Sequence, residues 1–255
     1  MYLNIFEDLG DQLSKLMDGI GAKFSNLGEQ FYQNFIEKDR WKLLLEGLEI
    51  TLLVTFFAVL IGIVIGFLVA SVRATYDKTK PGFILKFLNI ICKIYLTVIR
   101  GTPVLVQLMI IYFVIFGSVN ISKILVAVIA FGINSGAYVA EIVRGGIMSI
   151  DEGQFEAGRS LGFTYIQTMR YIIMPQAVRN ILPALGNEFI VLLKETSVGS
   201  YIALADLTKA GDVIKSVTYN PFMPLIAVAL IYLVMVVVFS YAVGRLERRL
   251  NNGRR

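Results

Sequence analysis

The sequence contains no histidine and only one cysteine, Cys92, among its 255 residues. Without histidine, neither Ser-His or Cys-His catalysis nor histidine metal ligation is available. A single cysteine excludes an internal disulfide bond and a zinc site built from cysteines. A glycine-rich phosphate-binding motif followed by Lys and Ser or Thr is also missing. Any ATP chemistry linked to this chain therefore requires a separate protein.

Charged residues are scarce as well. They make up 17% of the chain, whereas 56% is hydrophobic and the mean hydropathy is +0.69; a soluble domain has about 25% charged residues. Apolar runs of about 20 residues predict an all-α polytopic membrane protein. The runs are too long for a soluble core, and they do not alternate as the strands of a membrane β-barrel do.

The positions of the apolar runs predict five membrane spans. We expect a transmembrane domain over residues 47–246, a basic tail over 247–255 and an N-terminal extension over 1–46, interfacial or external. The extension has no positively charged segment followed by an apolar one, so a cleavable signal peptide is not expected. A helix on the membrane surface is favoured over a poorly ordered segment. The spans are predicted at about 47–72, 87–117, 121–142, 183–204 and 223–243.

The net charge of +5 is unevenly distributed between the two sides of the predicted membrane. Thirteen Lys and Arg residues fall in the segments after the first, third and fifth spans, against three in the other short loops. Positive residues accumulate on the cytoplasmic side of membrane proteins. This distribution predicts an external N-terminus, a cytoplasmic C-terminus and a cytoplasmic loop over 143–180. It also accounts for the positive charge without a nucleic-acid partner.

The second predicted span contains a break. Its apolar part after Pro103 covers about 14 residues, or about 21 Å of helix against a hydrocarbon core of about 30 Å, so the span must include residues before Gly101. Thr102 and Gln107 lie beside this break. Broken helices border substrate paths in transporters, which makes both residues candidates for a substrate pathway. A simple proline kink is the alternative.

Two smaller patterns concern helix packing. Gly62 and Gly66 form a GxxxG pair, which permits close helix approach, and packing within one subunit is favoured over dimerisation. Glu141 and Arg144 are three residues apart and therefore share a helix face, where they can pair. A structural ion pair and a coupling role both remain open for these two residues.

The fourth predicted span carries polar side chains among apolar ones. At 100° per residue they form one stripe, which should face the protein interior or a wet cavity. Ionisable groups within a membrane are functional candidates, although a Lys-Glu pair that holds helices together is an alternative. A membrane enzyme using these acid–base groups is a further alternative, but nothing supplies a nucleophile with an orienting base. The stripe consists of Asn187, Glu188, Lys194 and Glu195.

The stretch from Glu156 to Pro175 is the most extended polar segment in the second half of the chain. Ser149 to Glu152 and Thr164 to Gln167 each match a capping box, so a helix is predicted to start at each. Gly162 should form a corner between the two helices. Pro175 disfavours helix at Met174 and should end the second helix. The predicted result is a compact helix, corner and helix.

Residues in this loop resemble a pattern of ABC importer permease subunits: Glu-Ala-Ala, three residues, Gly, nine residues, Ile, one residue and Leu-Pro. Gly158 stands for the second alanine and Met174 for the leucine. Three further blocks resemble the polar amino-acid importer branch, of histidine, glutamine and arginine type. They are Arg100–Gln107, Ser135–Gly146 with part of Ile147–Gln154, and Asn187–Ser197, and the resemblance covers roughly residues 41–250.

The resemblance implies a type I ABC importer permease fold in the bacterial cytoplasmic (inner) membrane. It implies a cytoplasmic ABC ATPase dimer that holds ATP and magnesium, a second permease subunit, an external solute-binding protein and a polar amino-acid substrate moved by alternating access. The chain itself would contact lipid and need no cofactor. A sensor or scaffold subunit that does not transport is the alternative. The residues implied for ATPase coupling are Glu156, Ala157, Gly158, Gly162, Ile172 and Pro175.

Overall fold

The computed structural model describes residues 12–15, 17, 26–79 and 81–252, and the regular structure of this part is helical. Short π-helical turns cover Tyr32–Ile36, Ile110–Ile115 and Met169–Ile173, and 3₁₀ turns cover Glu37–Asp39 and Thr196–Ile202. The α-helices are α2 (Leu27–Phe31), α3 (Trp41–Lys78), α4 (Phe83–Gly101), α5 (Val104–Met109), α6 (Lys123–Met148), α7 (Glu152–Ser160), α8 (Tyr165–Thr168), α9 (Met174–Glu195), α10 (Leu207–Thr218) and α11 (Phe222–Asn252).

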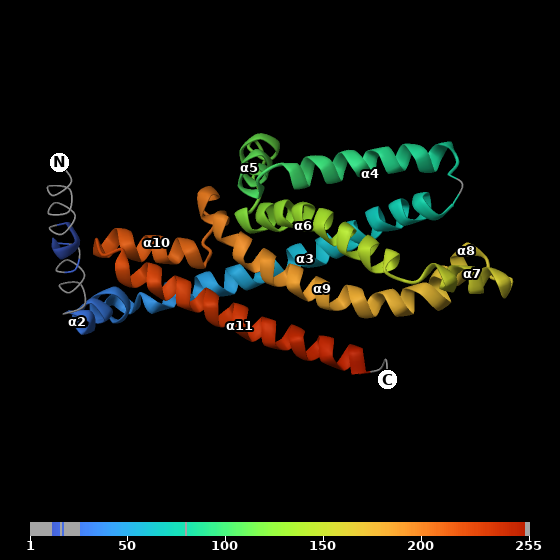
Figure 1. The fold of residues 1–255 in the computed structure, drawn as a ribbon. Helices are drawn as coiled ribbons and strands as arrows, with labels where there is room; N and C mark the ends of the chain where they lie inside the picture. The colour runs from blue at the N-terminus through green and yellow to red at the C-terminus, as the bar shows by residue number, and fades with distance from the viewer. Residues whose placement is uncertain (1–11, 16, 18–25, 80, 253–255) are drawn as a thin grey trace, which may run out of the picture.

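The long helices run lengthwise beside one another, and the short ones gather at the two ends (Figure 1). α7 and α8 lie at the end where α3 connects to α4, whereas α5 and α10 lie toward the other end. α6 contacts α3, α4 and α9, so it is the central helix of the bundle. The loop predicted over residues 143–180 is therefore far from α10.

Close packing between α3 and α6 depends on glycines in both helices. A Cβ at Gly62 would lie 3.0 Å from Ser135 Cβ, and one at Gly66 would overlap Val139. From the opposite helix, a Cβ at Gly132 would lie 2.7 Å from Ile61 Cγ2. The absence of these side chains lets the two backbones approach closely. The predicted packing of Gly62 and Gly66 within one subunit is confirmed.

Three described helices are long and apolar enough to cross a membrane: α3, α6 and the Phe222–Leu250 part of α11. α4 and the Val104–Ile115 segment count as a fourth span if the bent pair is taken as one. The all-helical membrane fold is thus confirmed, and length and composition give three to four spans where the sequence predicted five. α9 is not among them, since polar residues interrupt its apolar surface.

The break in the second predicted span lies where it was expected. Thr102 and Pro103 have extended backbone, which separates α4 from α5, and the two segments are bent by 107°. α4 alone has 19 residues, or about 28 Å of helix. The segment after the break therefore turns sharply away from α4 and does not continue along its axis.

The prediction that Pro175 ends a helix is wrong. The chain continues from α8 through the π-helical turn Met169–Ile173 into α9, and Met174 has helical φ and ψ of −60° and −41°. Pro175 lies in the first turn of α9, where no intrahelical N–H bond is required. The helix that contains the start of the fourth predicted span begins at Met174, and Pro183 lies inside α9.

The described part of the N-terminal extension packs at the α10 end of the bundle. Asn34 and Phe35 are buried, and the Thr218 hydroxyl donates a hydrogen bond of 2.8 Å to Asn34 Oδ1. These contacts tie residues near the start of α3 to the C-terminal end of α10. The expectation of a surface helix also covers residues 1–11, 16 and 18–25, which lie outside the described residues, as do residues 253–255 of the predicted basic tail.

Candidate functional site

The loop that contains α7 and α8 is built from local capping interactions. Thr164 and Gln167 form the predicted capping box at the start of α8, which is confirmed. α7 begins later than predicted, because Asp151 is its N-cap and accepts a hydrogen bond of 2.7 Å from the Gly153 amide. Ser149 instead donates to the Gly146 carbonyl. Both helices thus start at defined residues, as a rigid loop requires.

Two glycines set the angle between α7 and α8. Gly162 has a φ of +79°, a left-handed conformation that favours glycine, so the predicted corner is confirmed. Gly158 is buried, and a Cβ there would lie 2.6 Å from Thr168 Cγ2. The two short helices are therefore in direct contact, with no room for a side chain at position 158.

α7 is anchored to the rest of the bundle from one side. Phe155 is 4% exposed and packs in a cluster with Ala74 of α3 and Ile173. Lys78 Nζ lies 4.8 Å from the centroid of the Phe155 ring and 2.9 Å from Glu152 Oε1. A movement of α7 would therefore be transmitted to the end of α3 through apolar and ionic contacts.

The other side of this loop is open to solvent. Glu156 and Ala157 are exposed, as is Pro175, while Ile172 is half-buried. Leu161 and Ile166, beside the corner, are 71% and 75% exposed. Four of the six predicted coupling residues (Glu156, Ala157, Gly162 and Pro175) lie on the accessible surface of this loop, whereas Gly158 and Ile172 contribute to its internal packing.

The predicted pairing of Glu141 with Arg144 is wrong. Glu141 Oε1 lies 3.6 Å from Arg100 of α4, and Arg144 lies 3.0 Å from Asp77 of α3. Each of the two side chains therefore pairs with a residue of a neighbouring helix and not with the other. The two ion pairs connect α6 to α4 and to α3.

Gln107 spans the break between α4 and α5. Its amide nitrogen donates to the carbonyl oxygens of Ile99 (2.7 Å) and Thr102 (3.0 Å) and contacts the Thr102 hydroxyl at 2.8 Å. Its Oε1 accepts a hydrogen bond of 2.9 Å from Asn134 of α6. The side chain therefore satisfies carbonyl groups that the interrupted helix leaves unpaired and fixes the bend against α6.

The polar stripe of α9 is divided between two environments. Glu188 is 8% exposed and accepts a hydrogen bond of 2.9 Å from the Ser135 hydroxyl of α6. Asn187 and Lys194 are exposed, and Glu195 is half-buried. Among the described residues, neither Lys194 nor Glu195 forms a salt bridge, so a Lys-Glu pair between helices is not what holds α9 in place here.

Asn134 and Ser135 are functional candidates that the sequence reasoning missed. They are consecutive in α6, and one contacts Gln107 whereas the other contacts Glu188. The two groups of predicted pathway residues are thus joined through one turn of α6. Adjacent Asn and Ser inside an otherwise apolar span were the signal available in the sequence. Within the described part of the chain, no cluster of three or more acidic residues or cysteines is placed to hold a metal ion.

Comparison with known proteins gives a consistent set of matches. Residues 62–252 match the model of the family described as "Binding-protein-dependent transport system inner membrane component". The chain is 40% identical over 211 residues to the glutamine transport system permease protein GlnP of Escherichia coli (strain K12), covering 82% of this chain and 93% of that protein. It is 37% identical over 209 residues to the putative glutamine transport system permease protein GlnP of Rickettsia typhi (strain ATCC VR-144 / Wilmington), covering 81% and 92%.

Two solved structures are similar over most of their length. A chain in the crystal structure of an amino acid ABC transporter with histidines aligns with a TM-score of 0.75 and 47% identity, covering 84% of this chain and 98% of that chain. A chain of the MetNI methionine ABC transporter in an inward-facing conformation aligns with a TM-score of 0.70 and 23% identity, covering 82% and 97%. The latter likeness concerns the fold alone.

Proposed function

We propose that this chain, which belongs to the family of binding-protein-dependent transport system inner membrane components, moves a polar amino acid across the membrane by alternating access. Membership makes it the permease component of an ABC transporter in the inner membrane, with ATP hydrolysis performed by a separate subunit. Glutamine and histidine are the first substrates to test, because relatives and a structural neighbour carry those amino acids in their descriptions.

The coupling part of the proposal rests on the difference between the two sides of α7, one packed against the bundle and the other exposed. Its inner side is fixed to α3 by Phe155 and by the Lys78–Glu152 ion pair, and its outer side leaves Glu156 and Ala157 accessible. A cytoplasmic ATPase bound to the outer side would shift α3 when it moves α7. The proposed partners are an ATPase dimer, a second permease subunit and an external solute-binding protein.

We further propose five membrane crossings with an external N-terminus and a cytoplasmic C-terminus. Basic residues favour this orientation: Arg144, Arg159 and Arg170 lie in or beside the α7–α8 loop, and Arg245, Arg248 and Arg249 lie toward the end of α11. In this arrangement α9 crosses as the fourth span. Its polar residues would then face a substrate path shared with the partner subunits, which explains why the isolated chain leaves Asn187 and Lys194 exposed.

The proposed substrate path follows the polar contacts of α6. Thr102 and Gln107 lie at the bend after α4, Glu188 lies across α6, and Asn187, Lys194 and Glu195 continue along α9. A carboxylate suits the amino group of a substrate, and an ammonium group suits its carboxylate. The alternation between inner and outer access would change which of these groups the substrate can reach.

The decisive experiment is uptake into proteoliposomes that contain this chain and its ATPase. We expect labelled glutamine or histidine to accumulate inside the proteoliposomes. This accumulation should require ATP on the membrane face that binds the ATPase and a solute-binding protein on the opposite face. A Glu156→Lys variant should retain membrane insertion but lose uptake driven by ATP hydrolysis, since it reverses a charge on the exposed side of α7. Glu247→Lys makes the same charge change on exposed α11 and serves as the control.

Stable assembly of the complex without uptake of any amino acid would favour a sensor or scaffold subunit instead. Normal uptake by Glu156→Lys, with hydrolysis and transport in the wild-type ratio, would contradict the assignment of the α7 surface to ATPase coupling while leaving transport itself intact.

A further inference from the structure

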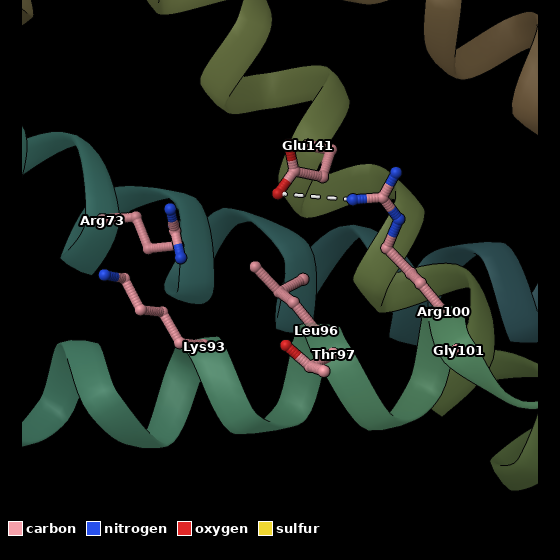
Figure 2. Close-up of a pocket in the computed structure, with 7 residues that line it drawn as sticks. All are labelled: Arg73, Lys93, Leu96, Thr97, Arg100, Gly101 and Glu141. Atoms are coloured by element: carbon pink, nitrogen blue, oxygen red, sulfur yellow. Dashed lines mark ion pairs between the residues drawn. The ribbon is translucent and has the colours of Figure 1, made fainter.

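A polar cavity of about 460 Å³ lies between α3, α4 and α6 (Figure 2). Glu188 is not among the residues that line it. Arg73 comes from α3, Lys93 and Arg100 from α4, and Glu141 from α6, with the Thr97 hydroxyl on the α4 wall. Pockets for small molecules generally measure about 300–1,000 Å³. The cavity is therefore of a size that admits a free amino acid.

The charges in this cavity do not balance. Three cationic side chains face one carboxylate, and that carboxylate, Glu141, lies 3.6 Å from Arg100. Arg73 and Lys93 form no salt bridge with any other described residue. Figure 2 shows their side chains extending from opposite helices into the same gap. Like charges at short range repel each other, so an anion between them would be favoured.

Arg73 also has an unused hydrogen-bond donor. Its Nε is shielded from solvent and has no hydrogen-bond partner in the described part of the chain. Buried donors of this kind are normally paired. A ligand carboxylate that enters between Arg73 and Lys93 would supply the missing negative charge, and the Arg73 guanidinium, which no described residue holds through Nε, can turn toward it.

The cavity adjoins the proposed path on the side of α7 and α8. Asn134 and Glu141 are seven residues apart in α6, which places them on the same face about 10 Å apart along the helix. On α4, Arg100 lies two residues before Thr102, where the break that Gln107 spans begins. A ligand that leaves the Asn134–Gln107 contact toward the cytoplasmic end would next meet the Glu141–Arg100 pair.

We propose that this cavity is a second binding site for the transported α-amino acid, used on the cytoplasmic side of the Glu188 and Gln107 contacts. The inference rests on the proposed transport function. The substrate carboxylate binds between Arg73 and Lys93, and the substrate ammonium group binds Glu141 in exchange for Arg100. The Glu141–Arg100 pair is suited to this exchange, because both side chains are partly exposed, at 34% and 45%.

The phosphate of an anionic lipid is the competing occupant. The outer face of α4 exposes apolar side chains such as Ile94 and Val98, so acyl chains can reach its surface. Glu141 argues against this occupant, since its carboxylate would repel a phosphate. A zwitterion, by contrast, uses both signs of charge that the cavity presents.

The test is direct binding of labelled glutamine and histidine to the purified complex of this chain and its ATPase, without ATP, in nanodiscs of phosphatidylcholine only. We expect about two molecules bound per chain in the wild type and about one in an Arg73→Gln/Lys93→Gln double variant. Single Lys93→Gln should weaken the affected site about tenfold, as expected for loss of one charged hydrogen bond. Lys86→Gln, seven residues earlier on the same face of α4 but outside the cavity, is the matched control and should bind as the wild type does.

Wild-type stoichiometry and affinity in the double variant would overturn the second site. So would retention of native phosphatidylglycerol by the wild type and its loss from the double variant with amino-acid binding unchanged, which would identify a lipid site. Assembly with the ATPase and the thermal midpoint of each variant report whether it is folded. Failure of the transport function itself would be seen separately, as absence of ATP-dependent uptake by the wild type.

Discussion

The Ser135 hydroxyl of α6 donates a hydrogen bond of 2.9 Å to Glu188 Oε1 of α9. Both residues are buried, at 0% and 8% exposure. The contact connects the central helix of the bundle to the helix that follows the α7–α8 loop. A change in the position of α9 therefore either carries α6 with it or breaks this bond.

Ser135→Ala is expected to destabilise the protein. It removes the donor and leaves a buried carboxylate without its partner, a loss of about 1–3 kcal/mol. The thermal denaturation midpoint in detergent should fall accordingly. Ser216→Ala removes an exposed hydroxyl from α10 and provides the control. Equal midpoints for the two variants would show that Glu188 does not depend on Ser135.

Gly158→Ala is expected to disturb the α7–α8 contact, because the new Cβ would lie 2.6 Å from Thr168 Cγ2. Overpacking of this kind costs about 1–3 kcal/mol. Thr168→Ala in the same chain removes Cγ2 and Oγ1, the two closest atoms, and should restore most of the stability and of the ratio of transport to ATP hydrolysis. Thr168→Ala alone should be tolerated, since the Thr168 hydroxyl is buried without a hydrogen-bond partner in the described structure.

The compensation between positions 158 and 168 is the informative result. If Gly158→Ala remains impaired in the double variant to the same extent as alone, the defect does not arise from the contact between these two residues.

Reversal of the Lys78–Glu152 pair is expected to reduce coupling more than stability. Lys78→Glu places two carboxylates together at the point where α7 meets α3, and Glu152→Lys in the same chain restores opposite charges at the 2.9 Å contact. The Lys78 side chain is 13% exposed and that of Glu152 is 72% exposed, so solvent screens the pair from one side and the free energy of unfolding should change by about 1–2 kcal/mol. The ratio of transported substrate to hydrolysed ATP should fall in the single variant and recover in the double variant. No recovery would mean that the Phe155 contact alone transmits the movement.

Asp206, the N-cap of α10, is expected to make stability depend on pH. Burial raises the pKa of this carboxyl to about 6, although the Lys209 and Thr208 amides and the Thr208 hydroxyl oppose the shift. The folded protein then binds a proton that the unfolded chain loses above about pH 4. The free energy of unfolding should therefore fall by up to about 3 kcal/mol as the pH rises from about 4 to 6, and it should level off above that.

An Asp206→Asn variant isolates this effect. Asparagine retains the N-cap hydrogen bond to the Lys209 amide and cannot ionise. The thermal midpoints of the wild type and the variant should converge near pH 4 and separate at pH 7, with the variant more stable. Parallel curves over this range would show that Asp206 has the same pKa in the folded and unfolded chain.

The features that were predictable from the sequence are those set by neighbouring residues. The capping box of Thr164 and Gln167, the corner at Gly162 and the break before Pro103 each depend on side chains within a few positions. The membrane class follows from composition in the same way. Length and composition give three to four spans where the sequence predicted five, because α9 mixes polar and apolar residues along its length.

The features that could not be predicted depend on which helices meet. Glu141 and Arg144 share a face, yet each binds a residue of another helix, Arg100 and Asp77. The effect of Pro175 depended on the π-helical turn before it, which allows the chain to enter α9 without interruption. The helical period places Glu188 and Lys194 in one polar stripe but does not say which part of the stripe meets Ser135 and which part stays exposed.

The glycine contacts between α3 and α6 limit how this protein can change shape. The two helices are in close contact at Gly62, Gly66 and Gly132, so no free space remains there for one helix to slide past the other. We therefore expect α3 and α6 to behave as one rigid body throughout a transport cycle. The contact of Lys78 with α7 lies at the end of that body, so a movement of the loop should shift α3 and α6 together. The helices that can then rearrange around this body are α4, α9 and α11.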